Sequence, residues 1–398
     1  MRIGIFGGTF NPPHNGHVTI ARAAVTQLGL DKLLIVPACV PPHKPLPSGV
    51  TAGQRYDMAA LMAAPVGRCA EASDMELHRT GKSYTSDTLV QLQQEYPDAE
   101  LWLLMGSDMF LSLHMWHEPE VICRIARIAA FRRVEEDIRA AMERQKQLLE
   151  RQYQAQVTLL ENPELIELSS TDVRAALAEG RGSGLVPAAV WGYIQREHLY
   201  GTATDLKHLT PDALRPIAMS YLKPKRMAHM LGTEATAVKL AKQYGADETE
   251  ARVAALLHDC TKKLDMDQQL VLCRQYGLEL DELEQQALKL LHSRTGAAIA
   301  RDVFGVNDAV YSAIRFHTTG KPHMTLLEKI LYLADYMEPT RDFDGVEHLR
   351  EVVRQDLDQG LLLGLTMTIE EMREMGNPIH HLTLDAQRYL IEQGVKQV

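Results

Sequence analysis

A segment near the start of the chain combines glycines and histidines at a spacing suited to binding phosphate groups. An apolar run (residues 2–6) leads into GGTFNPPHNGH (residues 7–17), which an apolar helical pattern follows. Gly7 and Gly8 let a ligand approach the backbone closely, and a helix start offers free N–H groups to an anion. His14 and His17 are three residues apart there, so each can donate a hydrogen bond and, if protonated, charge to one set of phosphate oxygens. Either histidine alone is more often a cap or a surface residue, but the combination indicates a phosphate site.

A second candidate anion site lies much later, in SSTDVR (residues 169–174), ahead of a helical pattern that stops near Gly180. Hydroxyl groups at a helix N-terminus, with Arg174 one turn into the helix, suit an anion. A plain N-cap followed by a surface arginine explains the same residues equally well. Other nucleotide motifs are missing from the sequence: no GxGxxG follows the first strand, and Gly81-Lys82-Ser83 lacks the upstream glycine of a P-loop.

The second half carries histidines and aspartates that suit metal binding. In ALLHD (residues 255–259), the pair His258-Asp259 follows two leucines at the end of an apolar helical pattern. Burying these groups without partners is costly, so metal coordination is an economical explanation. Imidazole and carboxylate ligands suit iron or manganese better than a thiolate-bound structural zinc, although zinc stays open. A lone histidine on a helix is usually a satisfied polar residue, and His258-Asp259 differs from that case. The seven candidates in this half are His229, His258, Asp259, His292, His317, His323 and Asp335.

In the first 200 residues, short apolar runs alternate with helical patterns. Strands are predicted at 2–6, 32–37, 101–105, 127–131 and 157–160, with helices between them, for example at 18–28 and 85–95. This alternation predicts an α/β fold with a doubly wound parallel sheet, in which the loops at the carboxyl ends of the strands carry the site. The run at 134–156 has charges on most faces of a helical pattern, and we predict a solvated surface helix there.

The α/β pattern ends near residue 200. The short, polar, turn-rich segment 201–209 is predicted to link a first domain at 1–200 to a second domain at 210–398. Strand signals nearly vanish after residue 210, whereas amphipathic helical patterns succeed one another, so the second domain is predicted to be all-α. Asp247 followed by Glu250 predicts a capping box at the start of the helix that runs through His258.

Composition excludes several classes of protein. The 398 residues include 42 basic and 52 acidic side chains, a net charge of −10, so no chain-wide cationic field is available to hold a nucleic acid. No apolar run approaches the roughly 18 residues of a membrane span. The five cysteines are widely spaced without a CxxC pair, which argues against a disulfide framework or a zinc knuckle and favours a reducing, cytoplasmic location.

The motifs of the first half resemble those of bacterial nicotinate-nucleotide adenylyltransferases, within the HxGH nucleotidyltransferase superfamily. HxGH alone marks only the superfamily, but Thr85 and Trp116 fall where this family contacts nicotinate. The resemblance implies a Rossmann-like fold and adenylyl transfer from ATP to nicotinate mononucleotide, with pyrophosphate leaving. A pantetheine-phosphate or nicotinamide-mononucleotide adenylyltransferase stays the alternative. The matching motifs are GGTFNPPHNGH (7–17), PPHK (41–44), SYTSDTL (83–89), GSD (106–108), Trp116 and SSTDVR (169–174).

This resemblance also implies roles for particular residues. Because the attacking phosphate is already ionised, the site has to orient the substrates and neutralise the triphosphate rather than supply a base. His14 and His17 are expected to act in catalysis, and Mg²⁺ to arrive with ATP as a bridge to the phosphates. Contacts to ATP or to the second substrate are expected from Gly7, Gly8, Thr9, Phe10, Lys44, Thr85, Gly106, Asp108, Trp116, Ser170, Thr171 and Arg174.

The second half resembles the HD phosphohydrolases, and among them the bacterial HD-type symmetrical bis(5′-nucleosyl)-tetraphosphatase. The matching segments are RMAHMLG (226–232), ALLHDCTKK (255–263), LLHSRTGA (290–297), IRFHTTG (314–320) and LYLADYMEPTRDF (331–343). The resemblance implies hydrolysis of diadenosine tetraphosphate to two ADP. It also implies that Asp259 is catalytic. The residues that it implies as ligands of one or two ions of iron or manganese are His229, His258, Asp259, His292, His317 and Asp335. Lys262, Arg341 and His323 could offset phosphate charge, but surface roles are expected for them.

Together these resemblances predict a fusion of two enzymes that both handle adenine nucleotides. A rival hypothesis makes the second half a nucleotide-sensing module without turnover. The full set of metal-binding side chains argues against that rival, because a pure binding module has no need to activate water. The expected partners are ATP, nicotinate mononucleotide and diadenosine tetraphosphate, not nucleic acid or membrane, and a homo-oligomer is compatible with the sequence.

Overall fold

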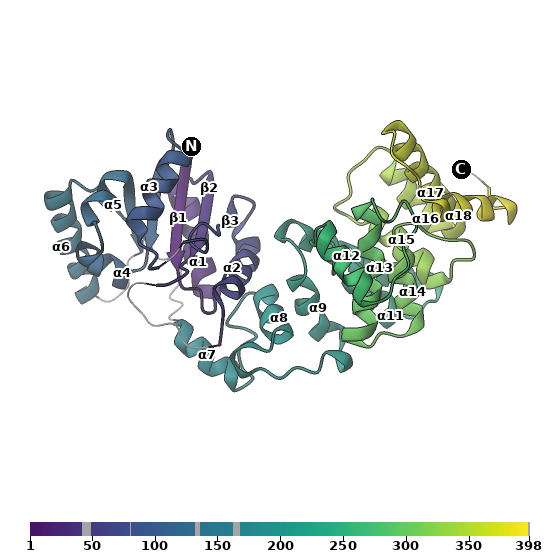
Figure 1. The fold of residues 1–398 in the computed structure, drawn as a ribbon, viewed down its shortest axis with the longest axis horizontal. Coiled ribbons are helices and arrows are strands. Elements are labelled where there is room, and N and C mark those ends of the chain that lie inside the picture. The colour runs from purple at the N-terminus through teal and green to yellow at the C-terminus, as the bar shows by residue number, and fades with distance from the viewer. Residues whose placement is uncertain (42–48, 80, 132–135, 162–167, 397–398) are drawn as a thin grey trace. The chain divides into compact units, whose positions relative to one another are not determined.

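The computed structural model describes residues 1–41, 49–79, 81–131, 136–161 and 168–396. The chain forms two compact units, Met1–Ala203 (unit 1) and Thr204–Val398 (unit 2), which are drawn in Figure 1. The division falls within residues 201–209, the segment that the sequence analysis takes as a linker. Each unit has an apolar core of its own.

Unit 1 is built on a single parallel sheet of six strands in the order β3-β2-β1-β4-β5-β6. All five predicted strands are confirmed, and a sixth, β3, is added. The sequence analysis missed β3 because this edge strand has only three residues, none of them buried, and therefore shows no apolar run. The strands are β1 (Arg2–Gly8), β2 (Lys32–Pro37), β3 (Ala70–Ala72), β4 (Glu100–Met105), β5 (Ala126–Phe131) and β6 (Val157–Leu160).

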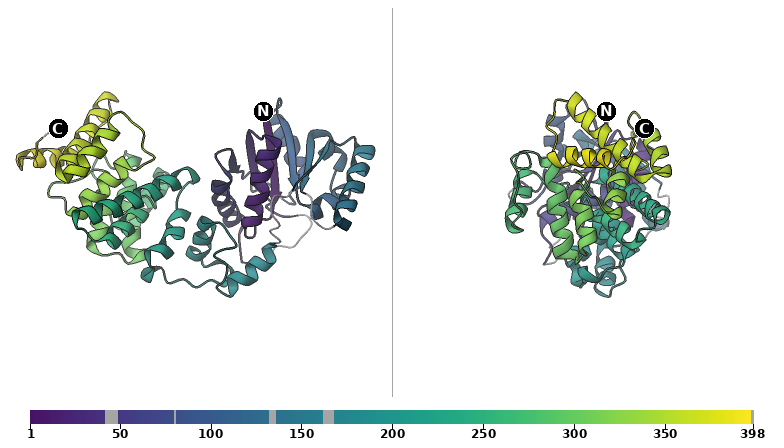
Figure 2. Two further views of the ribbon diagram at one scale, coloured as in Figure 1. Left: turned by 180° about the vertical axis from the view of Figure 1, so that it is seen from behind. Right: turned by 90° about the vertical axis from the view of Figure 1, so that its right-hand side faces the viewer.

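Helices cover both faces of this sheet (Figures 1 and 2). Right-handed crossovers place α1 and α2 on the face opposite α5, because the strand order runs in opposite directions on the two sides of β1. Ile3 and Ile5 of β1 pack with Leu89 of α3 and Ile122 of α5 in one core. The helical segments of unit 1 are α1 (Asn15–Leu28), α2 (Ala52–Val66), α3 (Thr85–Glu95), α4 (Ser107–Ser112), η1 (Leu113–Met115), α5 (Pro119–Ile125), α6 (Glu136–Tyr153), α7 (Ser170–Ala178), α8 (Ala188–Arg196) and η2 (Leu199–Gly201).

The order of the strands locates the site in unit 1. Strand β1 pairs with β2 on one side and with β4 on the other, so the direction of winding reverses at β1. In open α/β sheets, ligands bind in the crevice outside the carboxyl ends of the strands at such a reversal. Gly7 and Gly8 end β1, and Gly106 follows β4 directly. The fold therefore places two of the predicted motifs at this crevice.

The charged helix α6 is not solvated on all sides, which corrects the sequence-based prediction. Met142 and Leu149 are fully buried in the core of unit 1, whereas the neighbouring Leu148 is 37% exposed. The buried Gln145 donates from Nε2 to the backbone carbonyl of Phe110, at 3.1 Å. The buried face of α6 is narrow, because its members stand three and seven positions after Met142, so charges on the remaining faces hide it in the sequence.

All regular secondary structure in the described part of unit 2 is helical, as predicted, and its helices pack on one another without a sheet (Figure 2). Asp247 caps α11 by accepting a hydrogen bond from the backbone N–H of Glu250 at 2.8 Å. The elements are η3 (Leu206–His208), α9 (Pro211–Ser220), η4 (Pro224–Arg226), α10 (Met227–Tyr244), α11 (Glu248–Leu257), α12 (Met266–Gln275), α13 (Leu288–Phe304), α14 (Asp308–Phe316), α15 (Leu326–Met337), α16 (Val346–Gln355), α17 (Leu357–Glu374) and α18 (His381–Glu392). Within the described ranges, no helix has the length and apolar character that crossing a bilayer demands.

Candidate active sites

The glycines of unit 1 border open space at the predicted phosphate site. Among the described residues other than its chain neighbours, a Cβ atom added at Gly7 or at Gly106 would meet no heavy atom within 4 Å. A Cβ at Gly8 would instead lie 3.1 Å from the ring of Phe10. The backbone at the carboxyl ends of β1 and β4 is thus accessible to a ligand at Gly7 and Gly106, while Gly8 is needed for the close approach of Phe10.

His14 and His17 lie side by side, with ring centroids 3.8 Å apart. His14 precedes α1 as its N-cap, and its backbone N–H donates to Nδ1 of His17 at 3.1 Å. Because Nδ1 of His17 accepts this bond, the proton of the neutral ring resides on Nε2. His17 therefore presents an N–H donor on the side of the ring opposite His14's backbone.

Both histidines are neutral near pH 7. Burial lowers the pKa of His14 to about 4. Burial, and then the proximity of His14, lower the pKa of His17 well below its ordinary value. The pair can supply hydrogen bonds to phosphate oxygens, whereas positive charge, which the sequence analysis left open, has to come from other groups.

Phe10 is part of the core rather than of an open ligand surface. Its side chain is 1% exposed, and its ring packs against Phe6 at 5.5 Å and against His17 at 5.2 Å between centroids. Its φ of 47° is left-handed, which is uncommon for a residue with a side chain. A ligand can reach Phe10 only through its backbone, and the ring supports His17 from behind.

The SSTDVR residues hold the loop that precedes α1. Ser170 donates from Oγ to the carbonyl of Pro12 at 3.1 Å, and Arg174 donates from Nη1 to the carbonyl of Asn11 at 2.7 Å. Arg174 also donates from Nη2 to Oγ1 of the exposed Thr171, at 3.1 Å. The structure thus joins the two anion motifs, which lie more than 150 residues apart in sequence, and gives Ser170 and Arg174 a structural task beside any contact to phosphate.

Thr85 and Trp116 come from two segments that meet. Thr85 is the first residue of α3, Trp116 follows η1, and the rings of their neighbours Tyr84 and His117 are 4.3 Å apart. The indole N–H of Trp116 donates to Oγ of Ser112 at 3.3 Å. Asp108 is exposed in the first turn of α4. The predicted ligand Lys44 lies outside the described residues, as do Pro42 and His43 of its motif.

Sequence reasoning missed Arg55 and Tyr200. Arg55 is fully buried on α2 and donates to the carbonyl of Thr9 at 3.0 Å. Tyr200 donates from its hydroxyl to Oδ1 of Asn11 at 2.6 Å. A signal for Arg55 exists in the sequence, since it stands three residues before Met58 on the apolar stripe of α2, where a charged residue is out of place. No comparable signal marks Tyr200.

In unit 2, the structure brings all six predicted metal-binding side chains into one cluster. The ring centroid of His258 lies 5.5 Å from that of His229 and 5.1 Å from that of His317. The five helices that lead to the cluster pack on one another: α10 on α11 and α15, α14 on α11 and α15, and α13 on α14. The residues are His229 on α10, His258 and Asp259 directly after α11, His292 on α13, His317 directly after α14, and Asp335 on α15.

Nitrogen and oxygen atoms face one another across this cluster. Nε2 of His229 lies 3.0 Å from Oδ1 of Asp335 and 3.7 Å from Oδ2 of Asp259. Nε2 of His258 lies 3.5 Å from Oδ2 of Asp259 and 3.9 Å from Oδ1 of Asp335. On the other side of Asp259, Nε2 of His292 lies 3.3 Å from Oδ1. Asp259 therefore stands between two groups of imidazoles.

Hydrogen bonds behind the cluster determine where the ring protons sit. His258 and His317 place Nδ1 at 2.6 and 2.7 Å from the carbonyls of Ala255 and Ile314, and a carbonyl can only accept. Both rings therefore carry their proton on Nδ1 and turn an unprotonated Nε2 into the cluster. His229 does the same through its Nδ1, 3.0 Å from Oε1 of Glu338. A partner of this kind on the second nitrogen is the usual support of a metal-binding histidine.

These residues fit a divalent cation. Unprotonated nitrogens and carboxylate oxygens all accept, so the short distance from Nε2 of His229 to Asp335 is unfavourable until a positive charge lies between them. Nε2 of His229, Nε2 of His258 and Oδ1 of Asp259 are buried, with no hydrogen-bond partner in the described part of the chain. The ligand atoms of His229, His258 and Asp335 all lie within 4.8 Å of one another, and those of His258, Asp259 and His317 do as well. The donor set of imidazole and carboxylate suits iron, manganese or zinc.

Both carboxylates of the cluster are ionised. Burial alone raises the pKa of Asp259, but the proximity of His258, His292 and Lys262 outweighs it and holds that pKa well below its ordinary value. For Asp335, burial is likewise outweighed by His229 and His258, and its pKa is well below the ordinary value too. Both side chains are therefore available as anionic ligands at neutral pH.

Three cationic side chains border the cluster. Nζ of Lys262 lies 2.9 Å from Nε2 of His292, and Arg341 donates from Nη2 to Oδ1 of Asp335 at 2.8 Å. The expected surface roles are therefore wrong for Lys262 and Arg341. Arg226, which the sequence analysis did not single out, donates to Oδ2 of Asp259. These cations stand where the oxygens of a phosphate substrate could be neutralised.

Other histidines of unit 2 belong elsewhere. His323 is exposed and stacks on Tyr389, with ring centroids 4.1 Å apart. His380 and His381 gather with Asp281 in a further group of ligand-type atoms. Nδ1 of His380 accepts from the backbone N–H of Leu382 at 3.2 Å, so the proton of the neutral ring is on Nε2, which lies 3.0 Å from Asp281. His380 thus caps α18 and pairs with a carboxylate, a structural role.

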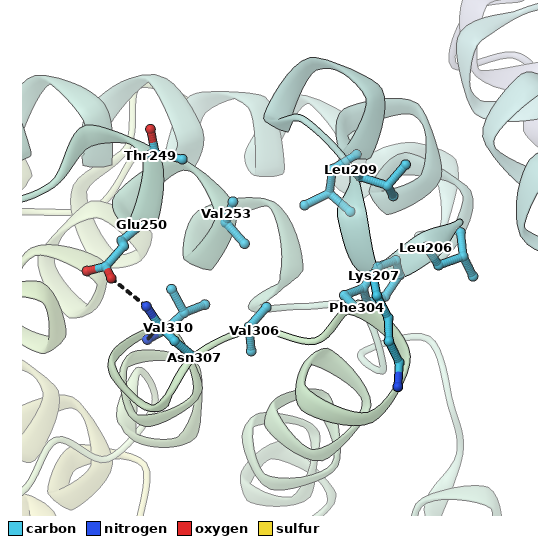
Figure 3. A pocket seen from close by; sticks show the side chains of 11 residues that line it. Leu206, Lys207, Leu209, Thr249, Glu250, Val253, Phe304, Val306, Asn307 and Val310 are labelled. Carbon is cyan, nitrogen blue, oxygen red and sulfur yellow. Dashed lines mark hydrogen bonds between the residues drawn. The ribbon is translucent and has the colours of Figure 1, made fainter. Parts of the chain in front are cut away.

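A small cavity of about 190 Å³ in unit 2 lies apart from the cluster (Figure 3). Leu206 and Leu209, from the segment predicted as a linker, line it together with Phe304 and Val306. At its rim Asn307 donates to Glu250 at 2.6 Å, the bond drawn in Figure 3. None of the six clustered residues lines this cavity. It is a packing feature where residues 206–209 meet the body of unit 2.

Known proteins match the two units separately. The profile of cytidylyltransferase-like proteins matches residues 5–176, and that of the HD domain matches residues 226–340. A symmetrical bis(5′-nucleosyl)-tetraphosphatase from Halalkalibacterium halodurans is 40% identical over 177 residues, which are 43% of this chain and 91% of that protein. A protein named as a probable nicotinate-nucleotide adenylyltransferase, from Synechococcus sp. (strain JA-3-3Ab), is 38% identical over 200 residues, 50% of this chain and 94% of that protein.

Among solved structures, an HD superfamily hydrolase from Clostridium acetobutylicum, described as involved in NAD metabolism, is 41% identical. The match covers 46% of this chain and 98% of the chain in that structure, with a TM-score of 0.45. The sequence identities to the curated relatives extend over nearly the whole of those proteins. The chain therefore belongs both to the nicotinate-nucleotide adenylyltransferases of the cytidylyltransferase-like family and to the HD family of the symmetrical bis(5′-nucleosyl)-tetraphosphatases.

Proposed function

We propose that this protein is a bifunctional enzyme with one activity in each unit. Unit 1 transfers the adenylyl group of ATP to nicotinate mononucleotide, giving nicotinate adenine dinucleotide and pyrophosphate. Unit 2 hydrolyses diadenosine tetraphosphate symmetrically to two ADP with the help of a divalent metal. All five cysteines lie outside disulfides, which supports a cytoplasmic location.

Adenylyl transfer in unit 1 needs orientation and hydrogen bonds more than proton transfer. The phosphate of nicotinate mononucleotide is already ionised and attacks the α-phosphorus of ATP, and the bond to pyrophosphate breaks. His17 donates from Nε2–H to a phosphate oxygen, and the open backbone at Gly7 lets the triphosphate approach the start of α1. Mg²⁺ bound to ATP would neutralise part of the triphosphate charge.

The observation that supports this activity is the pairing of two neutral imidazoles, 3.8 Å apart between centroids, beside accessible backbone at Gly7. The test is pyrophosphate release from ATP with nicotinate mononucleotide, nicotinamide mononucleotide or phosphopantetheine as acceptor. We expect nicotinate mononucleotide to be preferred. A preference for either of the other two would assign unit 1 to another branch of the superfamily.

Hydrolysis in unit 2 relies on the cluster of His229, His258, His292, His317, Asp259 and Asp335, which we propose as the metal ligands. A bound iron or manganese ion would supply Lewis acidity to phosphate oxygens and to a water molecule. The carbonyls of Ala255 and Ile314 and the carboxylate of Glu338 keep three of the imidazoles in the tautomer that can ligate. Arg226, Lys262 and Arg341 offset the charge of the bridging phosphates.

The observation that supports hydrolysis is the convergence of unprotonated ring nitrogens on two ionised carboxylates. Its test is metal analysis of the purified full chain, followed by product identification with dinucleoside polyphosphates of different lengths. Diadenosine tetraphosphate should give ADP alone. ATP and AMP as products would contradict symmetrical cleavage. A metal-loaded protein that bound diadenosine tetraphosphate and released no ADP would favour the nucleotide-sensing alternative.

A further inference from the structure

Arg55 connects two loops at the carboxyl edge of the sheet in unit 1. Its guanidinium donates from Nη1 to the carbonyls of Thr9, at 3.0 Å, and Ala38, at 2.6 Å. Nη2 donates to the carbonyl of Cys39 at 3.0 Å. Thr9 lies in the loop after β1, and Ala38 and Cys39 lie in the loop after β2. One planar fork therefore ties the loop after β1, which borders the crevice, to the loop after β2.

The charge of Arg55 has no anionic partner among the described residues. Its side chain is 0% exposed, and no described aspartate or glutamate forms an ion pair with it. Asp57, two residues later, is exposed and accepts a hydrogen bond from the hydroxyl of Tyr193 at 2.9 Å instead. Burial lowers the pKa of Arg55, but a guanidinium keeps its proton at neutral pH.

A buried cation without a carboxylate costs stability, so a neutral residue would serve better if Arg55 only filled space. Carbonyl dipoles offset part of this cost, and a polyanion bound at the loop would offset more. The loop it holds leads to His14, the N-cap of α1, and to His17 in the first turn of α1, and both are neutral. Positive charge near a triphosphate at this edge is available from two guanidinium groups that hold this loop, those of Arg55 and Arg174.

Two further carbonyls of the same loop are also held by side chains. Arg174 binds the carbonyl of Asn11, and Ser170 binds that of Pro12. Arg55 differs from them in being fully buried and in reaching the loop after β2 as well. The arrangement points to a role in aligning the two loops, beyond supporting either one.

We propose that Arg55 is a positioning residue for ATP, which aligns the loops after β1 and β2 through its three carbonyl bonds and attracts the triphosphate through its unpaired charge. This inference rests on the proposed adenylyl transfer. Lysine at this position keeps the charge but loses the planar fork, and glutamine keeps donors but loses the charge. The two substitutions thus separate alignment from attraction.

The test uses the full chain with R55K and R55Q. The dissociation constant of α,β-methylene-ATP, which cannot transfer its adenylyl group, is measured by calorimetry, together with kcat and with KM for ATP and for nicotinate mononucleotide. Arg22 is the matched control, because it is exposed on α1 and donates to the carbonyl of Pro65 at 2.6 Å. R22K and R22Q should bind the analogue as the unaltered protein does.

We expect R55Q to weaken analogue binding about 100-fold and R55K about 10-fold, with a larger rise in KM for ATP than for nicotinate mononucleotide. A role in folding alone would lower the melting temperature of both variants and leave the dissociation constants of the folded protein unchanged, which would overturn the proposal. If R55Q does not fold, unchanged binding by R55K overturns it equally. An unaltered protein that bound the analogue but formed no dinucleotide would refute the proposed transfer, whereas Arg55 would still be judged by the dissociation constants.

Discussion

His229 joins Glu338 to Asp335: its Nδ1 lies 3.0 Å from Oε1 of Glu338, and its Nε2 lies 3.0 Å from Oδ1 of Asp335. Glu338 is itself fully buried and accepts from the backbone N–H of Thr340 at 2.7 Å. Its pKa is low, because the bonds from Thr340 and His229 outweigh the effect of burial. An ionised carboxylate therefore sets the tautomer of a proposed metal ligand.

Replacing Glu338 by glutamine should weaken metal binding. The amide can turn its NH₂ group toward Nδ1 and then favours the ring tautomer that carries its proton on Nε2, where the metal is proposed to bind. We expect the affinity for Mn²⁺, titrated into metal-depleted full chain, to fall about 10- to 100-fold. E347Q is the control, since Glu347 pairs with Arg350 on α16 and its side chain is 77% exposed. Unchanged Mn²⁺ affinity in E338Q would remove Glu338 from this role.

A methyl group at Gly232 should disturb the same carboxylate. A Cβ atom there would lie 2.3 Å from Oε2 of Glu338, closer than any real contact permits. G232A is expected to destabilise the protein by about 1–3 kcal/mol and to lower Mn²⁺ affinity. G364A is the control, because its Cβ would meet Leu333 at an ordinary 3.6 Å. Full Mn²⁺ affinity in a destabilised G232A would mean that Glu338 does not govern metal binding.

The two activities should be separable by substitution. H17A removes the proposed donor to phosphate and should abolish pyrophosphate release while ADP formation continues. D259A removes the carboxylate between the two groups of imidazoles, and should abolish metal retention and ADP formation while adenylyl transfer continues. H78A serves as the control in unit 1, since the side chain of His78 is 76% exposed. Loss of both activities in either variant would show that the units depend on each other.

The buried His14 should make unit 1 less stable in acid. The unfolded chain takes up a proton at His14 below about pH 6.5, whereas the folded protein does so only near pH 4. The free energy of unfolding therefore falls as the pH drops through this window, by about 2 kcal/mol at pH 5 relative to pH 7.5. The variant H14Q should lack this share of the loss.

The measurement for His14 is urea unfolding followed by tryptophan fluorescence at both pH values. All three tryptophans lie in unit 1, so their emission reports on that unit. An equal loss of stability in H14Q and in the unaltered protein would show that His14 titrates normally in the folded state. The rate of adenylyl transfer, in turn, should not fall between pH 6 and 8 through protonation of an imidazole.

Helix α6 should contribute stability through one face alone. L149A removes a fully buried side chain and is expected to cost about 2–5 kcal/mol, because it leaves a cavity in the core of unit 1. L148A, one residue away and 37% exposed, should change stability by less than about 0.5 kcal/mol. Tryptophan fluorescence in urea again provides the readout. Equal effects would mean that α6 is solvated, as its sequence suggested.

The sequence by itself determined the architecture and the location of both candidate sites. Apolar runs of strand length alternate with helical patterns, so the parallel sheet follows from local preference and connection rules. Gly7, Gly8, His14 and His17 lie within 11 residues of the chain. They can therefore come close together in space with little help from tertiary structure. The pair His258-Asp259 is likewise recognisable in the sequence, because two ionisable residues at the end of an apolar helix are unusual. The short edge strand β3 escaped because it has no apolar run.

Only the tertiary structure decided the chemical state of these residues. Neutral imidazoles at His14 and His17 result from burial, which no local spacing reveals. Glu338 meets His229 across 109 positions of the chain, and Arg55 meets Thr9 across 46. Hydrogen-bond partners and desolvation depend on which distant segments pack together, so tautomers, charges and supporting residues appear only once the helices and loops are in place.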